Sequence, residues 1–183
     1  MAAGRDAAAD TWTVRREGNA RVLVHEGRPS PPDSFSVAIF PATQFQEVAV
    51  SVRLKTTGGA RTAGLVWKYQ DAMNHYAVQL DLATQDLAMY RVANGNRIRL
   101  EREDDLELDP DAWHSLKISL REGYVRVYLG GIRVYSERDR QSGGPTGVGL
   151  WVSGDSTVMF DDFRVADERR DSPRSGPPPT TRP

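Results

Sequence analysis

Residues 63–92, with the sequence AGLVWKYQDAMNHYAVQLDLATQDLAMYRV, decide the fold that this chain is expected to adopt. Polar or small stretches of hairpin length divide the segment into three strand-like runs. Three consecutive strands are therefore predicted, at residues 63–69, 75–81 and 87–92.

The middle strand has two chemically different faces, because side chains alternate along a strand. The predicted core face holds Tyr76, Val78 and Leu80. The opposite face holds His75, Ala77, Gln79 and Asp81. Such a polar row with a ring is either an ordinary hydrated sheet face or a platform for a ligand, and the sequence leaves both interpretations open.

The rest of the chain repeats the strand pattern. Residues 48–55 are the clearest case, since their apolar side chains alternate along the whole run. Asn94-Gly95 and Gly130-Gly131 are typical hairpin turns. About eleven strands at roughly ten-residue spacing, without a helical period, predict an all-β protein, either a sandwich or a barrel.

Composition excludes several classes of protein. The 183 residues are enough for one domain with a substantial core, and 24 Lys and Arg against 25 Asp and Glu leave a net charge of −1. This balance argues against a nucleic-acid partner, which usually selects a basic surface. The absence of cysteine excludes disulfides, thiolate zinc sites and cysteine nucleophiles. No apolar run has membrane-spanning length, so no membrane span is predicted.

The composition also divides the chain into three parts. Residues 1–10 are Ala-rich and are predicted to form a flexible leader, with no apolar segment of the signal-peptide kind. Residues 11–166 contain the strands and form the predicted β domain. Residues 167–183 are charged and then rich in Pro and Ser, which predicts a disordered tail. Localisation stays open on these residues.

Four motifs resemble a known bacterial pattern. They are GLVWKYQDAMNHYAVQLD, LAMYRVANGNR, WHSLKISLREGYVRVYLGG and VGLWVSGDSTVMFDDFRV, and the resemblance covers about residues 35–165. The pattern is similar to the concanavalin A-like lectin/glucanase superfamily, in particular its 3-keto-disaccharide hydrolase-like group. This group more often has Asp-Gly where this chain has Gly130-Gly131, a difference that affects a turn.

The resemblance implies a two-sheet antiparallel β-sandwich, a jelly roll with one concave face, which agrees with the strand count. It also favours an extracellular or periplasmic location. A shared fold does not define an activity, because one fold hosts many functions.

The polar face of the central strands is the candidate ligand site. Sugar sites combine planar hydrogen-bonding side chains with an aromatic ring as a stacking surface. The predicted ligand-binding residues are Lys68, His75, Gln79, Asp81, Arg126 and Trp151. Arg91 and Lys117 are further candidates whose register the sequence does not define. The alternative is a hydrated sheet face with the tryptophans in the core.

The sequence predicts no catalytic residue. Retaining glycosidases of this fold carry paired carboxylates on one strand, and no Glu-x-Asp-x-x-Glu run occurs here. No nucleophile elbow accompanies His25, His75 or His114. If the keto-sugar chemistry of the similar group were present, His75 or an Asp of the concave face would be the natural acid or base.

Adjacent acids in the last strand suggest a second kind of site. Asp161 and Asp162 stand between two phenylalanines, so one of them must face inward or lie at a bulge. A structural calcium ion is one interpretation, since carboxylates and carbonyls are its usual ligands. Hydrogen bonds to backbone amides, or a pair with an arginine such as Arg21, are the other. No further cofactor is predicted.

These observations favour a non-catalytic carbohydrate-binding module whose partner is a sugar or related polyol. One alternative is a hydrolase or lyase acting on 3-keto-glycosides. Another is a structural or partner-binding accessory domain. A groove in which polar side chains and a ring converge would favour the first two, and a hydrogen bond between His75 and Asp81 would favour the enzyme.

Overall fold

The computed structural model describes residues 12–31, 33–40, 47–139 and 147–168, and these residues form strands and turns without a helix. The strands are β1 (Trp12–Glu17), β2 (Ala20–His25), β3 (Phe35–Phe40), β4 (Val48–Gly58), β5 (Thr62–Asp71), β6 (Asn74–Asp81), β7 (Asp86–Ala93), β8 (Asn96–Glu103), β9 (His114–Arg121), β10 (Tyr124–Leu129), β11 (Ile132–Arg138), β12 (Val148–Ser153) and β13 (Thr157–Asp167). The predicted leader, residues 1–10, and the predicted tail beyond residue 168 lie outside the described residues.

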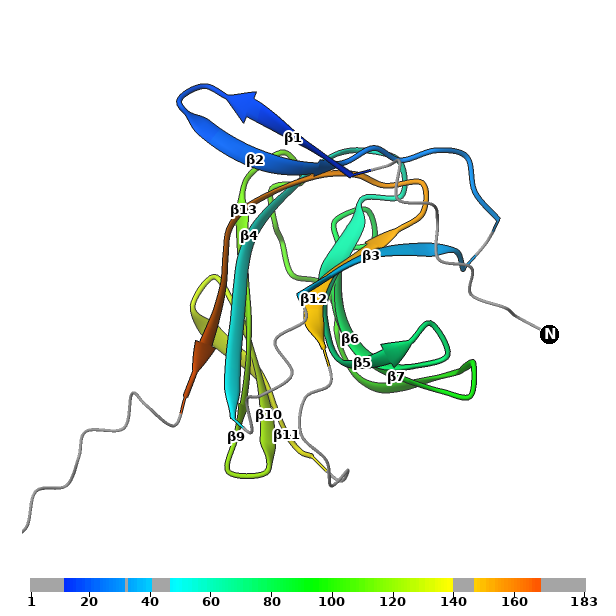
Figure 1. Ribbon diagram of the computed structural model, residues 1–183, viewed down its shortest axis with the longest axis vertical. Coiled ribbons are helices and arrows are strands. Elements are labelled where there is room, and N and C mark those ends of the chain that lie inside the picture. Colours follow the sequence, from blue (N-terminus) through cyan, green and yellow to red (C-terminus); the bar gives the residue numbers. More distant parts are fainter. Residues whose placement is uncertain (1–11, 32, 41–46, 140–146, 169–183) are drawn as a thin grey trace, which may run out of the picture.

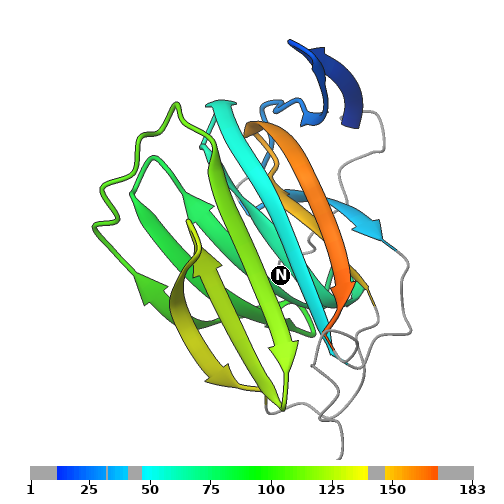
Figure 2. The same cartoon turned by 90° about the vertical axis from the view of Figure 1, so that its left-hand side faces the viewer.

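The strands form two antiparallel sheets packed face to face (Figures 1 and 2). The seven-stranded sheet has the order β1-β2-β13-β4-β9-β10-β11, and the six-stranded sheet has the order β3-β12-β5-β6-β7-β8. The three strands predicted from residues 63–92 are β5, β6 and β7, adjacent in the six-stranded sheet. The all-β, two-sheet antiparallel sandwich is therefore confirmed.

The core lies between the sheets and follows the alternation that the sequence shows. From the six-stranded sheet, Val78 and Leu80 are fully buried in it, and from the seven-stranded sheet Val50 and Leu54 meet them. Each such side chain contributes roughly 1.5–3 kcal/mol by leaving water. The predicted core face of β6 is therefore confirmed, and its opposite face points away from the other sheet.

His25 is a buried polar residue within the seven-stranded sheet. Its Nδ1 lies 2.8 Å from the carbonyl oxygen of Ser156, and its ring meets Trp12 edge-on at 5.0 Å. No described residue bonds its buried Nε2. Burial lowers the pKa of His25 below its ordinary 6.5, and the Ser156 hydrogen bond offsets this only in part. His25 is thus a core residue that favours the neutral state.

The described part of the chain has no helix that is long and apolar enough to cross a membrane.

Candidate ligand groove

The six-stranded sheet curls so that its outer face, away from the seven-stranded sheet, is concave (Figure 1). The register places Trp151, Gly64 and Gln79 side by side on three neighbouring strands. A Cβ at Gly64 would lie 1.8 Å from the carbonyl oxygen of Val78, so only glycine permits this approach of β5 to β6. The missing side chain leaves a hollow between Trp151 and Gln79.

Two adjoining hollows, of about 210 and 310 Å³, run over this face. They have four lining residues in common, so they form one groove across β12, β6 and β8. The shared residues are Asp33, Gln79, Arg97 and Trp151. Its volume is in the range of small-ligand sites.

The floor of the groove is aromatic. Trp151 retains 7% of its exposure, and its ring stacks on Phe35 with centroids 5.9 Å apart. The His75 ring lies 5.3 Å from Phe35 on the other side. Val66 and Ala77 complete this small apolar cluster, which is separate from the main core. The exposed part of Trp151 therefore presents an apolar surface inside a polar groove.

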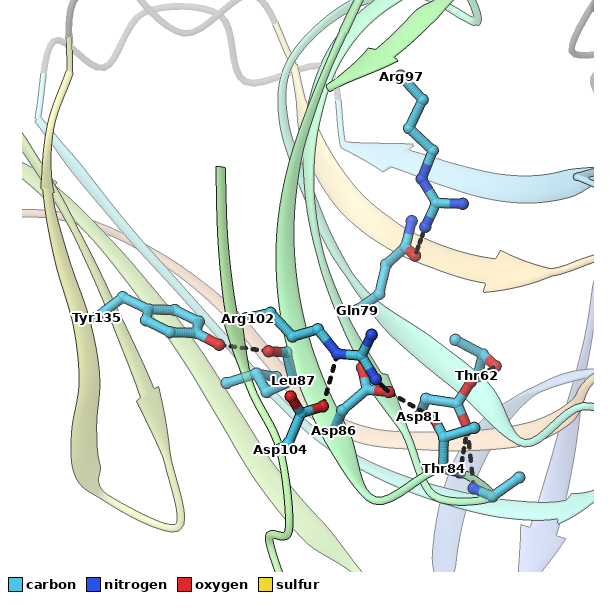
Figure 3. Close-up of polar contacts among 11 residues, drawn as sticks. Thr62, Gln79, Asp81, Thr84, Asp86, Leu87, Arg97, Arg102, Asp104 and Tyr135 are labelled. Carbon is cyan, nitrogen blue, oxygen red and sulfur yellow. Dashed lines mark hydrogen bonds and ion pairs between the residues drawn. The ribbon is translucent and has the colours of Figure 1, made fainter. Parts of the chain in front are cut away.

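Gln79 and Arg97 supply the hydrogen-bonding groups beside that floor (Figure 3). Arg97 donates to the Gln79 Oε1 at 2.5 Å, and its guanidinium lies 3.7 Å above the ring centroid of Tyr90. Asp33 is 4.0 Å from the same guanidinium. Gln79 is 6% exposed, and no described residue accepts a hydrogen bond from its Nε2. The pair is thus held in place while the amide nitrogen stays able to donate to a ligand.

Asp81 has a structural role at one end of the groove. Its Oδ1 accepts the backbone N–H groups of Ala83 and Thr84, and its Oδ2 accepts the Thr62 hydroxyl at 2.9 Å (Figure 3). Oδ1 thus holds the β6–β7 turn, and Oδ2 holds the start of β5. The structure places Asp81 in the groove lining as predicted, with its hydrogen-bonding capacity directed mainly to the protein itself.

His75 lies at the other end of the groove and is also engaged. It is 3% exposed, lies between the rings of Phe35 and Tyr69, and has its Nδ1 3.3 Å from the Asp71 carbonyl. His75 and Asp81 are six residues apart on β6, roughly 20 Å in an extended strand. The two therefore form no acid–base pair.

Lys68 does not share the groove with these residues. A bulge between Trp67 and Asp71 interrupts the alternation of β5, and Lys68 has a φ of 48°. Its Nζ bonds Asp139 at 2.6 Å in an ion pair whose side chains are 10% and 16% exposed. The expectation from simple alternation is wrong at this position, because the bulge turns the side chain toward Asp139.

Arg126 lies on the far side of the sandwich, so it is not a neighbour of the groove. On β10 of the seven-stranded sheet, Val125 and Val127 face the core, which leaves Arg126 outward. Its guanidinium lies 5.5 Å from the Tyr124 ring centroid and 3.5 Å from Glu122. Lys117 shares this outer face through its contact with Tyr128.

Asp161 and Asp162 lie at a bulge of β13, which is one of the two placements that the sequence allows for adjacent acids in a strand. Asp161 accepts the backbone N–H of Asp162, which has a φ of 51°. Asp162 lies 3.2 Å from Arg164 and 3.7 Å from Arg53. No group of three or more His or acidic residues gathers in the part of the chain that is described. Two guanidinium groups at one carboxylate do not fit a calcium site.

Sequence reasoning missed several residues of the groove. Tyr90 continues the polar face because it pairs with Ala77, so alternation along β7 could have found it. Arg97 follows the Asn94-Gly95 turn and pairs with Val92, which also fixes its side of the sheet. Asp33 comes from the loop before β3, and no local pattern places it over the sheet.

Comparisons with known proteins identify the fold. A scan against protein-family models finds no match, and neither does a comparison with curated protein sequences. Among solved structures, a carbohydrate-binding module, CBM66 of Bacillus subtilis, is similar with a TM-score of 0.63 and 18% identity, over 85% of this chain and 94% of that one.

Two further structures share the fold. Sheep galectin-11 in complex with glycerol has a TM-score of 0.56 and 10% identity, over 71% of this chain and 97% of that one. The GH43 protein BlXynB of Bacillus licheniformis has a TM-score of 0.59 and 15% identity, over 90% of this chain and 38% of that one. At these identities the likeness establishes a galectin-like jelly-roll sandwich and nothing finer.

Proposed function

We propose that this chain is a carbohydrate-binding β-sandwich module that holds its ligand in the concave groove without chemically converting it. One observation carries the proposal: the ring of Trp151 and the Gln79–Arg97 pair line the same groove, separated only by Gly64. Sugars offer an apolar C–H face and ring hydroxyls, which match an aromatic surface beside fixed amide and guanidinium donors.

Each residue of the groove contributes a different kind of contact to the ligand. The exposed part of Trp151 offers the stacking surface, and Gln79 Nε2 offers a hydrogen-bond donor. Arg97 is held in place by Tyr90 and Gln79, so ligand binding loses little conformational entropy in ordering the arginine side chain. Asp33 supplies an acceptor at the groove edge.

The structural neighbours support this class of ligand. Two of them are described as a carbohydrate-binding module and a galectin. They share the two-sheet fold, and the groove described above occupies the concave face that this fold offers. An extracellular or periplasmic place of action is part of the same proposal, since polysaccharides are met there.

The hydrolase or lyase alternative finds less support in the groove. It needs an acid and a base that face one another across the substrate. His75 is enclosed by two rings, and the carboxylate of Asp81 holds the β6–β7 turn. The accessory-domain alternative predicts that no small ligand binds in the groove. A test of glycan binding therefore distinguishes it from the proposed function.

A glycan screen followed by calorimetric titration of a hit tests the proposal. Gln79→Ala should weaken binding by about tenfold or more, because a donor in a buried site contributes on the order of 1–3 kcal/mol. Arg126→Ala, on the far face, is the control and should bind as the unaltered chain does. Failure of every glycan to bind, or equal binding by the Gln79 variant, would contradict the proposal.

A further inference from the structure

A second cleft opens at one side of the sandwich, between β7–β8 of one sheet and β10–β11 of the other. Its volume is about 580 Å³, and it shares no lining residue with the concave groove. It lies where the two sheets separate, so its floor is the end of the core and its rim is the sheet edges. Its lining includes Trp67, Tyr76, Met89, Arg91, Arg99 and Arg138.

The floor of this cleft is flat and apolar. The rings of Trp67 and Tyr76 stack with centroids 5.6 Å apart and an interplanar angle of 25°. Trp67 and Met89 are each 1% exposed, and Val125 closes the side that belongs to the seven-stranded sheet. A planar apolar body would extend this stack without disturbing it.

The rim carries three arginines. The guanidinium groups of Arg91, Arg99 and Arg138 make no ion pair or side-chain hydrogen bond to any residue within the described ranges. Arg91 is near enough to Tyr76 to act against the rise that burial causes in the pKa of that phenol. A guanidinium group without a side-chain partner is suited to bind a carboxylate, through two parallel hydrogen bonds.

The acids of the cleft do not cancel this charge. Asp139 is paired with Lys68 at 2.6 Å. Glu137 lies beside Glu101, and burial together with this neighbour raises the pKa of the Glu101 carboxyl. The unpaired charges that face the opening are therefore mainly positive.

We infer that this cleft is a second ligand site, which binds a small molecule with a flat apolar body and one carboxylate. The body lies against the partly exposed ring of Tyr76, which is stacked on the buried Trp67, and the carboxylate meets Arg91 or Arg99 at the rim. The site is independent of the groove and of any sugar bound there, since the two have no residue in common.

Phenylacetate and its neutral analogue phenylacetamide are the matched probes. Titration calorimetry should show saturable binding of the acid and binding of the amide weaker by about tenfold, since a charge-assisted pair is replaced by a neutral contact. Arg99→Gln should remove most of this preference. Arg133→Gln, an exposed arginine outside the cleft lining, should leave it unchanged.

Three outcomes would overturn the inference. They are no saturable binding of phenylacetate in the millimolar range, equal affinity for acid and amide, or loss of binding in Gln79→Ala, which alters only the groove. If Arg99→Gln does not fold, Arg91→Gln serves in its place, because Arg91 is the other arginine to which the carboxylate is assigned. Sugar titrations of the same variants separate this test from that of the proposed function.

Discussion

The two outer faces of the sandwich carry the same pair of residue types with different consequences. On the concave face Arg97 lies over Tyr90, and on the far face Arg126 lies over Tyr124. Arg97 is joined to the buried Gln79 inside a groove, whereas Arg126 is paired with the exposed Glu122. An arginine on a tyrosine is therefore no sign of a site by itself. The hollow around it makes the difference.

Glycine creates that hollow. Gly64 and Gly149 both face the concave side, and a Cβ on either would lie within about 2 Å of a backbone carbonyl of the neighbouring strand, at 1.8 Å and 2.1 Å respectively. On the far face, the residue paired with Arg126 on the neighbouring strand is a serine, Ser119. The groove is thus a product of close strand approach.

The largest effect is expected from Gly64→Ala. The new Cβ would collide with the Val78 carbonyl, so β5 and β6 must separate, and the free energy of unfolding should fall by about 2–4 kcal/mol. Urea unfolding measures this. Gly58→Ala is the control, since its Cβ would meet only Thr157 at an ordinary 4.0 Å. An equally small change in both variants would refute the role given to Gly64.

The next effect concerns Lys68, which the alternation of β5 misplaces in the groove. Lys68→Met should lower the free energy of unfolding by about 1–3 kcal/mol, because it removes the cation that is paired with the partly buried Asp139 carboxylate. Arg15→Ala removes an exposed pair with Glu26 and should cost less than about 1 kcal/mol.

Glycan binding gives the second readout for Lys68. It should be unchanged in Lys68→Met if this lysine lies outside the groove. Weaker glycan binding in a folded Lys68→Met variant would show that Lys68 contributes to the ligand site.

His25 gives the seven-stranded sheet a dependence on pH. Its folded pKa is lowered, so below pH 6.5 the unfolded chain takes up a proton that the folded chain resists. Stability should therefore be complete above that pH and should fall as the pH drops from 6.5 toward the folded pKa. Urea unfolding across this range should show the slope, and His25→Gln should reduce it. A profile that is the same in both proteins would remove His25 as the cause.

The smallest effect is expected from chelation. The arginines at Asp162 already supply its positive partners, so EDTA should leave the melting temperature unchanged. A clear fall in the melting temperature, reversed by added calcium, would restore the calcium interpretation of Asp161 and Asp162.

The sequence predicted what depends on local alternation. The two faces of β6 follow from its period of two, and this placed His75, Gln79 and Asp81 correctly on the outer side. Trp151 was found because its motif marks a strand of the same fold. Hairpin signals such as Asn94-Gly95 were equally reliable, since turn geometry is a local property.

Other positions could not be predicted, for identifiable reasons. Lys68 was misplaced because a bulge changes the face of the sheet to which a side chain points. Lys68 has a left-handed φ, but a lysine, unlike a glycine, does not indicate such a backbone conformation in the sequence. Arg126 was assigned to the groove although its strand belongs to the other sheet, because pairing between distant strands is not local. Asp33 reaches the groove from a loop, whose path depends on tertiary contacts.

The most direct test of the account compares the two arginine–tyrosine pairs. A glycan identified by screening is titrated by calorimetry into Arg97→Ala and Arg126→Ala. The account predicts about tenfold or greater weakening in Arg97→Ala and unchanged affinity in Arg126→Ala. Equal affinity in the two variants, or a loss confined to Arg126→Ala, would contradict a ligand site on the concave face.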